Sequence, residues 1–217
     1  LDAFPVRVTR WDARQFVWQE MGVAWEAGRF VEVSFPRRDD TPVPDLPEEV
    51  LSVLPDGFLT ETSPAAESWW TTTAQALKQG QLLAIDYGLT AAEFIVPQRQ
   101  QGTRRGYRKH QFVSDLVAEP GACDLTAHVQ FSRIQLRGEE TGLQTACYCD
   151  QREGLTGILR GILNTPERFA PWSPSLNRQF QTLTHPEHLG RSFRWLISSA
   201  CWVESTTASM PTGRSCS

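Results

Sequence analysis

The stretch GFLTETSPAAESWWTTTAQALKQGQLLAIDYG, residues 57–88, decides the fold class of this chain. Its first residues read as a strand, and Ser63 followed by Pro64 is the usual opening of a helix, with serine as the N-cap and proline at the first helical position. The helix is predicted to run almost to Gly80, which would stop it. The apolar run over residues 82–85 predicts a strand buried on both faces of a parallel sheet. Strand, helix and buried strand in succession are typical of an α/β fold.

Local patterns predict further elements upstream of this unit. Two β-like runs within residues 16–34 flank the pair Ala27-Gly28 and predict a hairpin with one buried face. Residues 36–47 are charged and rich in proline, which indicates a surface loop. Pro47 then opens a short predicted helix, because proline suits the first helical turn.

Downstream of residue 88, loops alternate with short predicted elements. Residues 97–106 form a Gln/Arg/Gly loop, and residues 107–113 are extended. Helices are predicted over residues 130–138, 150–163 and 175–183, and strands over residues 143–148 and 192–197. Nine of the last 20 residues are Ser or Thr, and this composition predicts a disordered tail over residues 198–217. We therefore expect one α/β domain over residues 1–197 followed by that tail.

Composition, charge and missing motifs argue against several functional classes. The formal net charge of -4 gives no overall attraction to nucleic acid, and we expect neither a membrane span nor a signal peptide. Five cysteines at irregular spacing argue against a secreted disulfide framework, so a reducing cytoplasm is expected. Phosphate-binding, dinucleotide-binding and nucleophile-elbow motifs are absent from the sequence. Cys147-x-Cys149 and His185-x-x-His188 lack partners at ligand spacing, so no metal is predicted.

Three groups of polar residues are candidates for chemistry. Asp86-Tyr87-Gly88 follows the predicted buried strand, where ligands of open α/β sheets bind, although the same residues could simply form a turn. Asp124 and His128 could face one site with His128 as general base, or Asp124 could cap a helix. The basic and aromatic loop over residues 99–110 could hold nucleic acid, clamp a carboxylate or an acidic protein segment, or be merely solvated. The negative net charge of the chain weakens the hypothesis that this loop binds nucleic acid.

Five motifs, taken together, resemble one family. Asp2-Ala3-Phe4-Pro5-Val6 resembles the end of its Asn-Glu-x-x-Asp-Ala-x-Pro-Val motif. Glu61-Thr62-Ser63-Pro64 resembles its Glu-Ile-Ser-Pro helix entry, and Ile85-Asp86-Tyr87-Gly88 matches its buried strand and turn. Residues 102–110 are similar to its Gly-Thr-Leu-Arg-Ala-Tyr-x-x-His segment, and residues 120–129 follow its Pro-Gly-x-x-Asp-Leu-Thr-Ala-His-Val run. The chain thus resembles the MidA-like methyltransferases, relatives of the mitochondrial arginine methyltransferase that assists complex I assembly.

The resemblance implies a fold and an activity. The expected fold is a partial Rossmann-like class I methyltransferase fold, from the strand-four exit onward, with a β-hairpin insertion and a C-terminal α/β cap. The expected reaction transfers a methyl group from S-adenosylmethionine to a protein side chain such as arginine. In the family, the glycine-rich cofactor loop and the ribose-binding acid precede the position of Leu1, so we expect the main cofactor loop to be absent from this chain. A non-catalytic protein-interaction remnant or a truncated product are the alternatives.

Position and resemblance assign roles to individual residues. Asp86, Asp124 and His128 are the predicted catalytic residues, with Asp86 or Asp124 orienting a guanidinium or amine. Predicted substrate contacts are Asp2, Tyr87, Arg105, Tyr107, His110 and Thr126, and predicted cofactor contacts are Asp2 and Pro5. A protein substrate is the expected partner, a homodimer is a further possibility, and neither nucleic acid nor membrane is expected.

Overall fold

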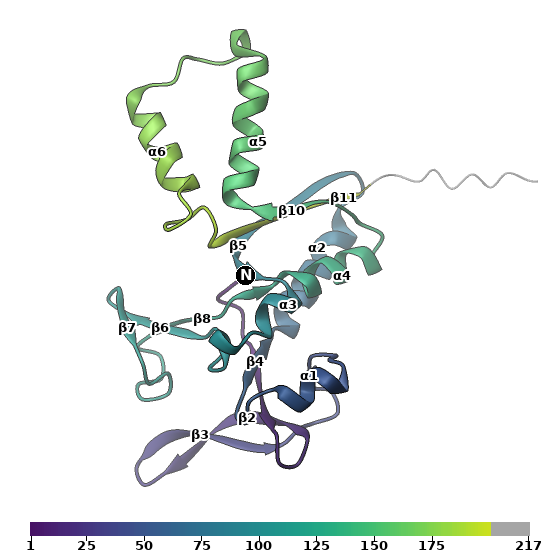
Figure 1. Ribbon diagram of the computed structural model, residues 1–217, viewed down its shortest axis with the longest axis vertical. Coiled ribbons are helices and arrows are strands. Elements are labelled where there is room, and N and C mark those ends of the chain that lie inside the picture. Colours follow the sequence, from purple (N-terminus) through teal and green to yellow (C-terminus); the bar gives the residue numbers. More distant parts are fainter. Residues whose placement is uncertain (201–217) are drawn as a thin grey trace, which may run out of the picture.

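Three small β-sheets and the helices between them make up the computed structural model of the chain, which describes residues 1–200 (Figure 1). The first sheet is antiparallel and has the strand order β3-β2-β1-β4. Its strands are β1 (Arg7–Asp12), β2 (Val17–Glu26), β3 (Arg29–Pro36) and β4 (Leu59–Thr62). In Figure 1 this sheet lies at the lower end of the molecule, beside the short helix α1 (Glu48–Val53).

Two further sheets follow along the chain. The second sheet has the order β10-β11-β5-β9, with strands β5 (Gly80–Leu89), β9 (Val129–Gln130), β10 (Gln144–Asp150) and β11 (Phe193–Ala200). The third sheet has the order β7-β6-β8, with strands β6 (Arg105–Arg108), β7 (Gln111–Val113) and β8 (Asp124–Thr126). These three short strands reach sideways from the body, and β8 leads back through residues 127 and 128 to β9 (Figure 1).

Helices connect the strands and cover the second sheet. They are α2 (Pro64–Ala76), α3 (Ala91–Phe94), α4 (Phe131–Glu140), α5 (Gln151–Asn164) and α6 (Pro174–Thr184), with short 3-10 turns at Pro97–Arg99 and Pro166–Arg168. The predicted N-cap of α2 is confirmed, because the Ser63 hydroxyl accepts a hydrogen bond from the backbone N–H of Ala66 at 3.2 Å. Helices α5 and α6 lie side by side and project from the sheet as an arm (Figure 1).

The main core lies where α2 and α4 pack against the second sheet. Trp70 of α2, Phe131 and Ile134 of α4 and Leu196 of β11 are almost inaccessible to solvent. A smaller core of Trp11, Leu54 and Phe58 lies under the first sheet and α1. The prediction of an α/β fold is confirmed, since helices and sheets alternate along the chain and share the main core.

Strand β5 differs from its prediction in both pairing and burial. It pairs antiparallel with β11 along its length and parallel with β9 only at Gly88 and Leu89. One of its faces is open, since Leu83 and Ile85 are 52% and 42% exposed. The prediction of a parallel strand buried on both faces was therefore wrong. An apolar run indicates burial but does not report the direction of the neighbouring strand. Asp86-Tyr87-Gly88 accordingly lies within the strand and is not a turn.

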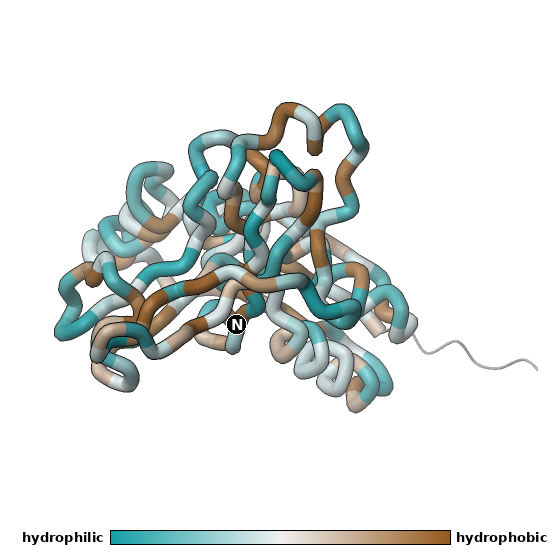
Figure 2. Tube along the Cα trace, turned by 90° about the horizontal axis from the view of Figure 1, so that it is seen from below, coloured by the Kyte–Doolittle hydropathy of each residue, from teal (hydrophilic) through white to brown (hydrophobic). Residues whose placement is uncertain are grey.

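The predicted hairpin is present, but much of it is exposed. Ala27 and Gly28 both have positive φ angles, as a two-residue hairpin turn of the type I′ class requires. Apolar and polar segments alternate along the strands nearest the viewer in Figure 2, yet Val23 and Trp25 are 55% and 63% exposed. The prediction of one buried face was wrong for the outer half, where these two side chains lie largely in solvent, although Glu32 forms an ion pair with Arg104.

Strand β11 is longer than predicted. It continues through Ser198 to Ala200, where Ser198 is buried and pairs with Leu82 of β5. The Ser/Thr-rich composition concealed this because serine favours turns and loops, whereas here the strand pairing on both sides overrides that preference. The rest of the predicted tail, residues 201–217, lies outside the described residues.

A buried carboxylate joins the first sheet to the loop that leads into the third. Glu61 on β4 accepts hydrogen bonds from the backbone N–H of Thr103 at 2.9 Å and from the Thr103 hydroxyl at 3.2 Å. The Thr103 hydroxyl in turn accepts a bond from the backbone N–H of His128 at 3.0 Å. Gly102 allows this close approach, since it has φ +71° and a Cβ there would lie 2.0 Å from the Glu61 carboxylate.

We predict that Gly102→Ala destabilises the fold far more than Gly121→Ala. Both glycines have positive φ angles, but a Cβ at Gly121 would meet nothing within 4 Å. Gly121→Ala should therefore cost only the conformational strain of about 1 kcal/mol. Gly102→Ala should cost at least about 2 kcal/mol more, because it also displaces the Glu61 carboxylate from its donors. Urea unfolding of both variants measures the difference, and equal losses would contradict the account.

We also predict that Glu61→Gln changes how stability depends on pH. Burial raises the pKa of Glu61 above its ordinary value of 4.5. The stability that Glu61 contributes is then fully present below the unfolded pKa and is lost as pH rises through the raised folded value. The advantage of the wild-type protein over Glu61→Gln should accordingly shrink as pH rises above the ordinary glutamate pKa of 4.5. Parallel unfolding curves across this range test it, and an advantage that grows with pH would contradict it.

Candidate functional site

A cleft of about 620 Å³ lies beside the C-terminal part of β5. Its walls come from the N-terminal loop, from β5, from β6 and from the connection between β8 and β9. It brings together six of the residues that the sequence singled out: Asp2, Tyr87, Arg105, Tyr107, Thr126 and His128. The two segments that follow the closest family motifs, residues 102–110 and 120–129, therefore meet at one place.

Asp86 fixes one wall of this cleft without lining it. Its side chain is largely buried, and its carboxylate accepts hydrogen bonds from the backbone N–H groups of Asp2, at 3.1 Å, and of Tyr87, at 2.8 Å. The amino group of Leu1 also donates to it. These bonds attach the N-terminal loop to β5, so Asp86 positions Asp2.

Asp2 is held from two sides and faces the cleft. Besides its bond to Asp86, its carbonyl accepts a hydrogen bond from the backbone N–H of Ala127 at 2.9 Å. Burial, followed by the negative charge of Asp86, raises the pKa of the Asp2 carboxyl. The carboxylate of Asp2 is therefore disposed to pair with a cationic group that enters the cleft.

His128 carries the imidazole of the site. Its Nδ1 is buried and has no hydrogen-bond partner among residues 1–200. Burial, with the positive charges of Arg99 and Arg105, lowers the pKa of His128, while Asp86 opposes that shift. The imidazole is therefore neutral near pH 7, which is the form that can accept a proton.

Aromatic rings form two other parts of the wall. Tyr87 packs on Phe193 with ring centroids 4.1 Å apart. Tyr107 is 40% exposed and meets Phe112 edge to face at 6.3 Å. Such rings can bound the flat face of a planar group such as a guanidinium.

Besides Asp86, three predicted site residues do not line the cleft. Asp124 is exposed on β8, where it lies opposite Tyr107 in the strand register. It is therefore not a helix N-cap, which corrects that alternative. His110 is exposed in the turn between β6 and β7 and has φ 64°. Pro5 is also exposed, and its carbonyl accepts a hydrogen bond from the Ser63 hydroxyl at 2.8 Å.

Arg99 of the basic loop also lines the cleft, and three further charged residues there were not singled out from the sequence. These three are Glu93, Arg191 and Arg194. Glu93 pairs with Arg194 at 2.6 Å and forms a capping box with Thr90, and the Thr-x-x-Glu spacing could have located that helix start. Arg191 and Arg194 come from the segment that leads into and begins β11, and no local pattern connects that segment with β5.

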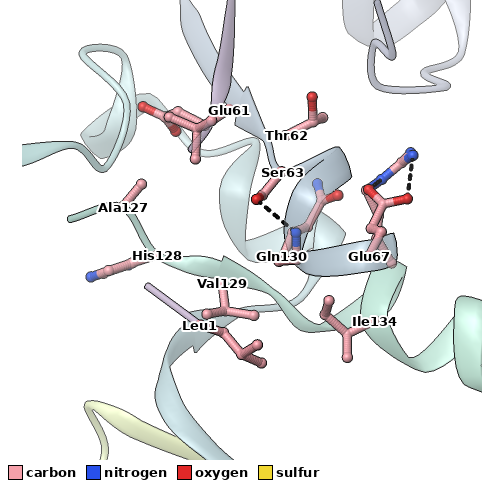
Figure 3. A pocket seen from close by; sticks show the side chains of 13 residues that line it. Leu1, Glu61, Thr62, Ser63, Glu67, Ala127, His128, Val129, Gln130 and Ile134 are labelled. Carbon is pink, nitrogen blue, oxygen red and sulfur yellow. Dashed lines mark hydrogen bonds and ion pairs between the residues drawn. The ribbon is translucent and has the colours of Figure 1, made fainter. Parts of the chain in front are cut away.

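His128 also lines a second, much smaller cavity (Figure 3). Glu61, Ser63, Glu67 and Gln130 are among the side chains that surround it. Its volume of about 20 Å³ is room for a single water molecule, not for a substrate. The larger cleft is therefore the candidate site.

Residues 1–200 offer neither a metal centre nor a membrane-spanning helix. Among residues 1–200, no group of three or more His, Cys, Asp or Glu side chains is arranged to hold a metal ion. Over the same part of the chain, no helix has the length and apolar character needed to cross a membrane.

Comparison with known proteins gives a family and two related structures. Residues 1–149 match the model of a family described as "Putative S-adenosyl-L-methionine-dependent methyltransferase". A crystal structure from Burkholderia thailandensis, of a protein described as a "likely methyl transferase" and bound to S-adenosyl-homocysteine, is 31% identical, with a TM-score of 0.71, over 92% of this chain and 51% of that chain. A second crystal structure, of an uncharacterised protein from the same organism, is also 31% identical, with a TM-score of 0.72. The match covers 91% of this chain and 52% of that chain. This chain thus spans about half the length of the solved structures it matches. No curated protein matches it.

We predict that Arg105→Gln raises the pKa of His128. Removing a nearby positive charge makes the imidazolium less unfavourable, so the pKa should move back toward its ordinary value of 6.5. NMR titration of the assigned His128 ring measures the shift. Arg160→Gln, at an exposed position on α5, is the control and should leave the value unchanged. An unchanged pKa in Arg105→Gln would show that the two side chains do not interact.

Proposed function

This chain belongs to the S-adenosyl-L-methionine-dependent methyltransferase family that residues 1–149 match, and on that premise we propose that its cleft holds the methyl acceptor, a protein side chain such as arginine. The observation that carries the proposal is the meeting of a carboxylate, a neutral imidazole and two tyrosine rings in one cleft. Methyl transfer to nitrogen requires alignment of the acceptor and removal of one proton from it. Those are tasks that these groups can perform.

Asp2 is the residue proposed to bind the acceptor. Its carboxylate would receive two N–H groups of a guanidinium, a pairing that fixes orientation as well as position. Tyr87 and Tyr107 would bound the guanidinium plane and keep it from turning. Asp86 acts as a positioning residue, since it holds the loop that carries Asp2.

His128 is the residue proposed to take the proton. A neutral imidazole can accept it, and the lowered pKa keeps the ring in that form near neutral pH. Once the imidazole is protonated, Asp86 is the acid whose charge favours the imidazolium. The proton can then pass to solvent through the cleft mouth.

Residues 1–200 provide groups suited to a methyl acceptor, but they lack the usual binding loop for S-adenosylmethionine. Within residues 1–200, no closely spaced glycines form a turn between a parallel strand and a helix, which is the usual cradle for such a nucleotide. We therefore assign no described residue to the cofactor, and contacts of Asp2 and Pro5 with it stay predictions.

The same observation favours one alternative function. A chain that forms an acceptor cleft but binds no cofactor would act as a protein-interaction module. Calorimetry with S-adenosyl-homocysteine, on protein shown by circular dichroism to be folded, separates the two. Binding supports the methyltransferase, and the absence of binding by folded protein supports the interaction module.

We predict that Asp2→Asn lowers kcat/KM for methylation of an arginine-containing protein about 10- to 100-fold, because a hydrogen bond to a charged group is lost. The measurement is transfer of labelled methyl from S-adenosylmethionine, with the modified residue located by mass spectrometry. Asp45→Asn, at an exposed carboxylate in the loop before α1, is the control and should keep full activity. Asp124→Asn, measured alongside, tests the other predicted carboxylate. Full activity of Asp2→Asn would refute the acceptor assignment.

A further inference from the structure

We propose that the cleft, together with a groove that adjoins it at Arg105, holds an extended and acidic segment of the protein acceptor. This inference rests on the proposed function, because it names the class of protein that the acceptor site would take. The groove has a volume of about 540 Å³, and Arg105 lines both it and the cleft. A chain lying in one cavity can thus continue past this side chain into the other.

The cleft holds more positive charge than its own carboxylates neutralise. Arg194 is paired with Glu93, whereas Arg99, Arg105 and Arg191 form no ion pair with any carboxylate of residues 1–200. Within residues 1–200, the side chains of Arg99 and Arg105 donate only to backbone carbonyls, at 2.8 Å each, and such bonds leave the charges uncompensated. Carboxylates of an incoming segment would compensate them, with bidentate geometry available at each guanidinium.

The groove is bordered by two strands at the edges of their sheets. Strand β3 pairs only with β2, and β7 pairs only with β6, so each has an edge with no partner within residues 1–200. Arg29, Phe30 and Phe112 from these strands line the groove. A segment in an extended conformation can bond to such edges through its backbone, which makes that conformation the favoured one here.

The charges along this path favour a protein over a nucleic acid. Asp2 in the cleft and Asp115 in the groove lie among the arginines. A regular row of phosphates would be repelled at both carboxylates. A protein segment can instead place an acceptor cation at Asp2 and acidic residues at the arginines, so that each charge meets its opposite.

Fluorescence anisotropy with the full 217-residue chain tests the proposal directly. Three labelled peptides of equal length carry one central arginine that is flanked by glutamate, by glutamine or by lysine. The glutamate peptide should bind most tightly, and the preference should weaken as salt is raised. Arg105→Gln and Arg191→Gln should each weaken its binding about tenfold, the expected loss for one charge-assisted contact. Arg160→Gln should bind like the wild type, and circular dichroism verifies that every variant is folded.

Each alternative result has a defined meaning. Equal binding of the three peptides, or full binding by both cleft variants, overturns the proposal. A single-stranded RNA that binds more tightly than the glutamate peptide, and loses affinity in Arg105→Gln, assigns the surface to nucleic acid and also overturns it. The assay needs no methyl donor. Selective peptide binding without any methylation therefore upholds this inference and rejects the enzyme, whereas methylation that ignores the flanking charges does the reverse.

Discussion

The buried carboxylate of Glu61 is the interaction on which the arrangement of the site depends. It lies on β4 of the first sheet and accepts two hydrogen bonds from Thr103, in the loop that continues directly into Arg105 and β6. Through the Thr103 hydroxyl the same network reaches the backbone of His128. Because charged or polar groups in the interior must be satisfied by specific donors, this network tolerates only one position of the loop. The cleft is therefore built on a fixed polar contact as much as on apolar packing.

Elements with a local cause could be predicted from the sequence. Ser63 caps α2 because its hydroxyl needs only the N–H of a residue three positions away, and Ala27-Gly28 turns the hairpin because both adopt positive φ angles. The environment of β5 could not be predicted, since its main partner β11 comes from the far end of the described chain. An apolar run indicates that a strand is buried. It does not indicate which strand lies beside it or whether the two run parallel or antiparallel.

The residues of the candidate site also divide into those that local motifs predict and those that only long-range pairing places there. Asp2, Tyr107 and His128 belong to recognisable motifs, and the fold brings them to one cleft. Asp124 and His128 are four positions apart, which would place them on one face of a helix. Here they belong to an extended segment, in which β8 ends at Thr126, and the carboxylate stays exposed. Arg191 belongs to no recognisable motif. It reaches the cleft because β11, which follows it, pairs with the distant strand β5.

The exposed outer half of the β2–β3 hairpin bears on how broadly the proposed groove could accept acidic segments. Few buried side chains hold this half in place, so we expect it to open locally at a lower free energy than β4. It also lines one side of the groove, through Arg29 and Phe30. The loop at the other side of the groove is held by the hydrogen bond between Thr103 and Glu61. The part of the groove near Glu61 would then decide which segments bind. The β3 side of the groove would adapt its conformation to segments that differ in sequence. Slow amide exchange near Thr103 and rapid exchange along β3 would be the signature of that asymmetry.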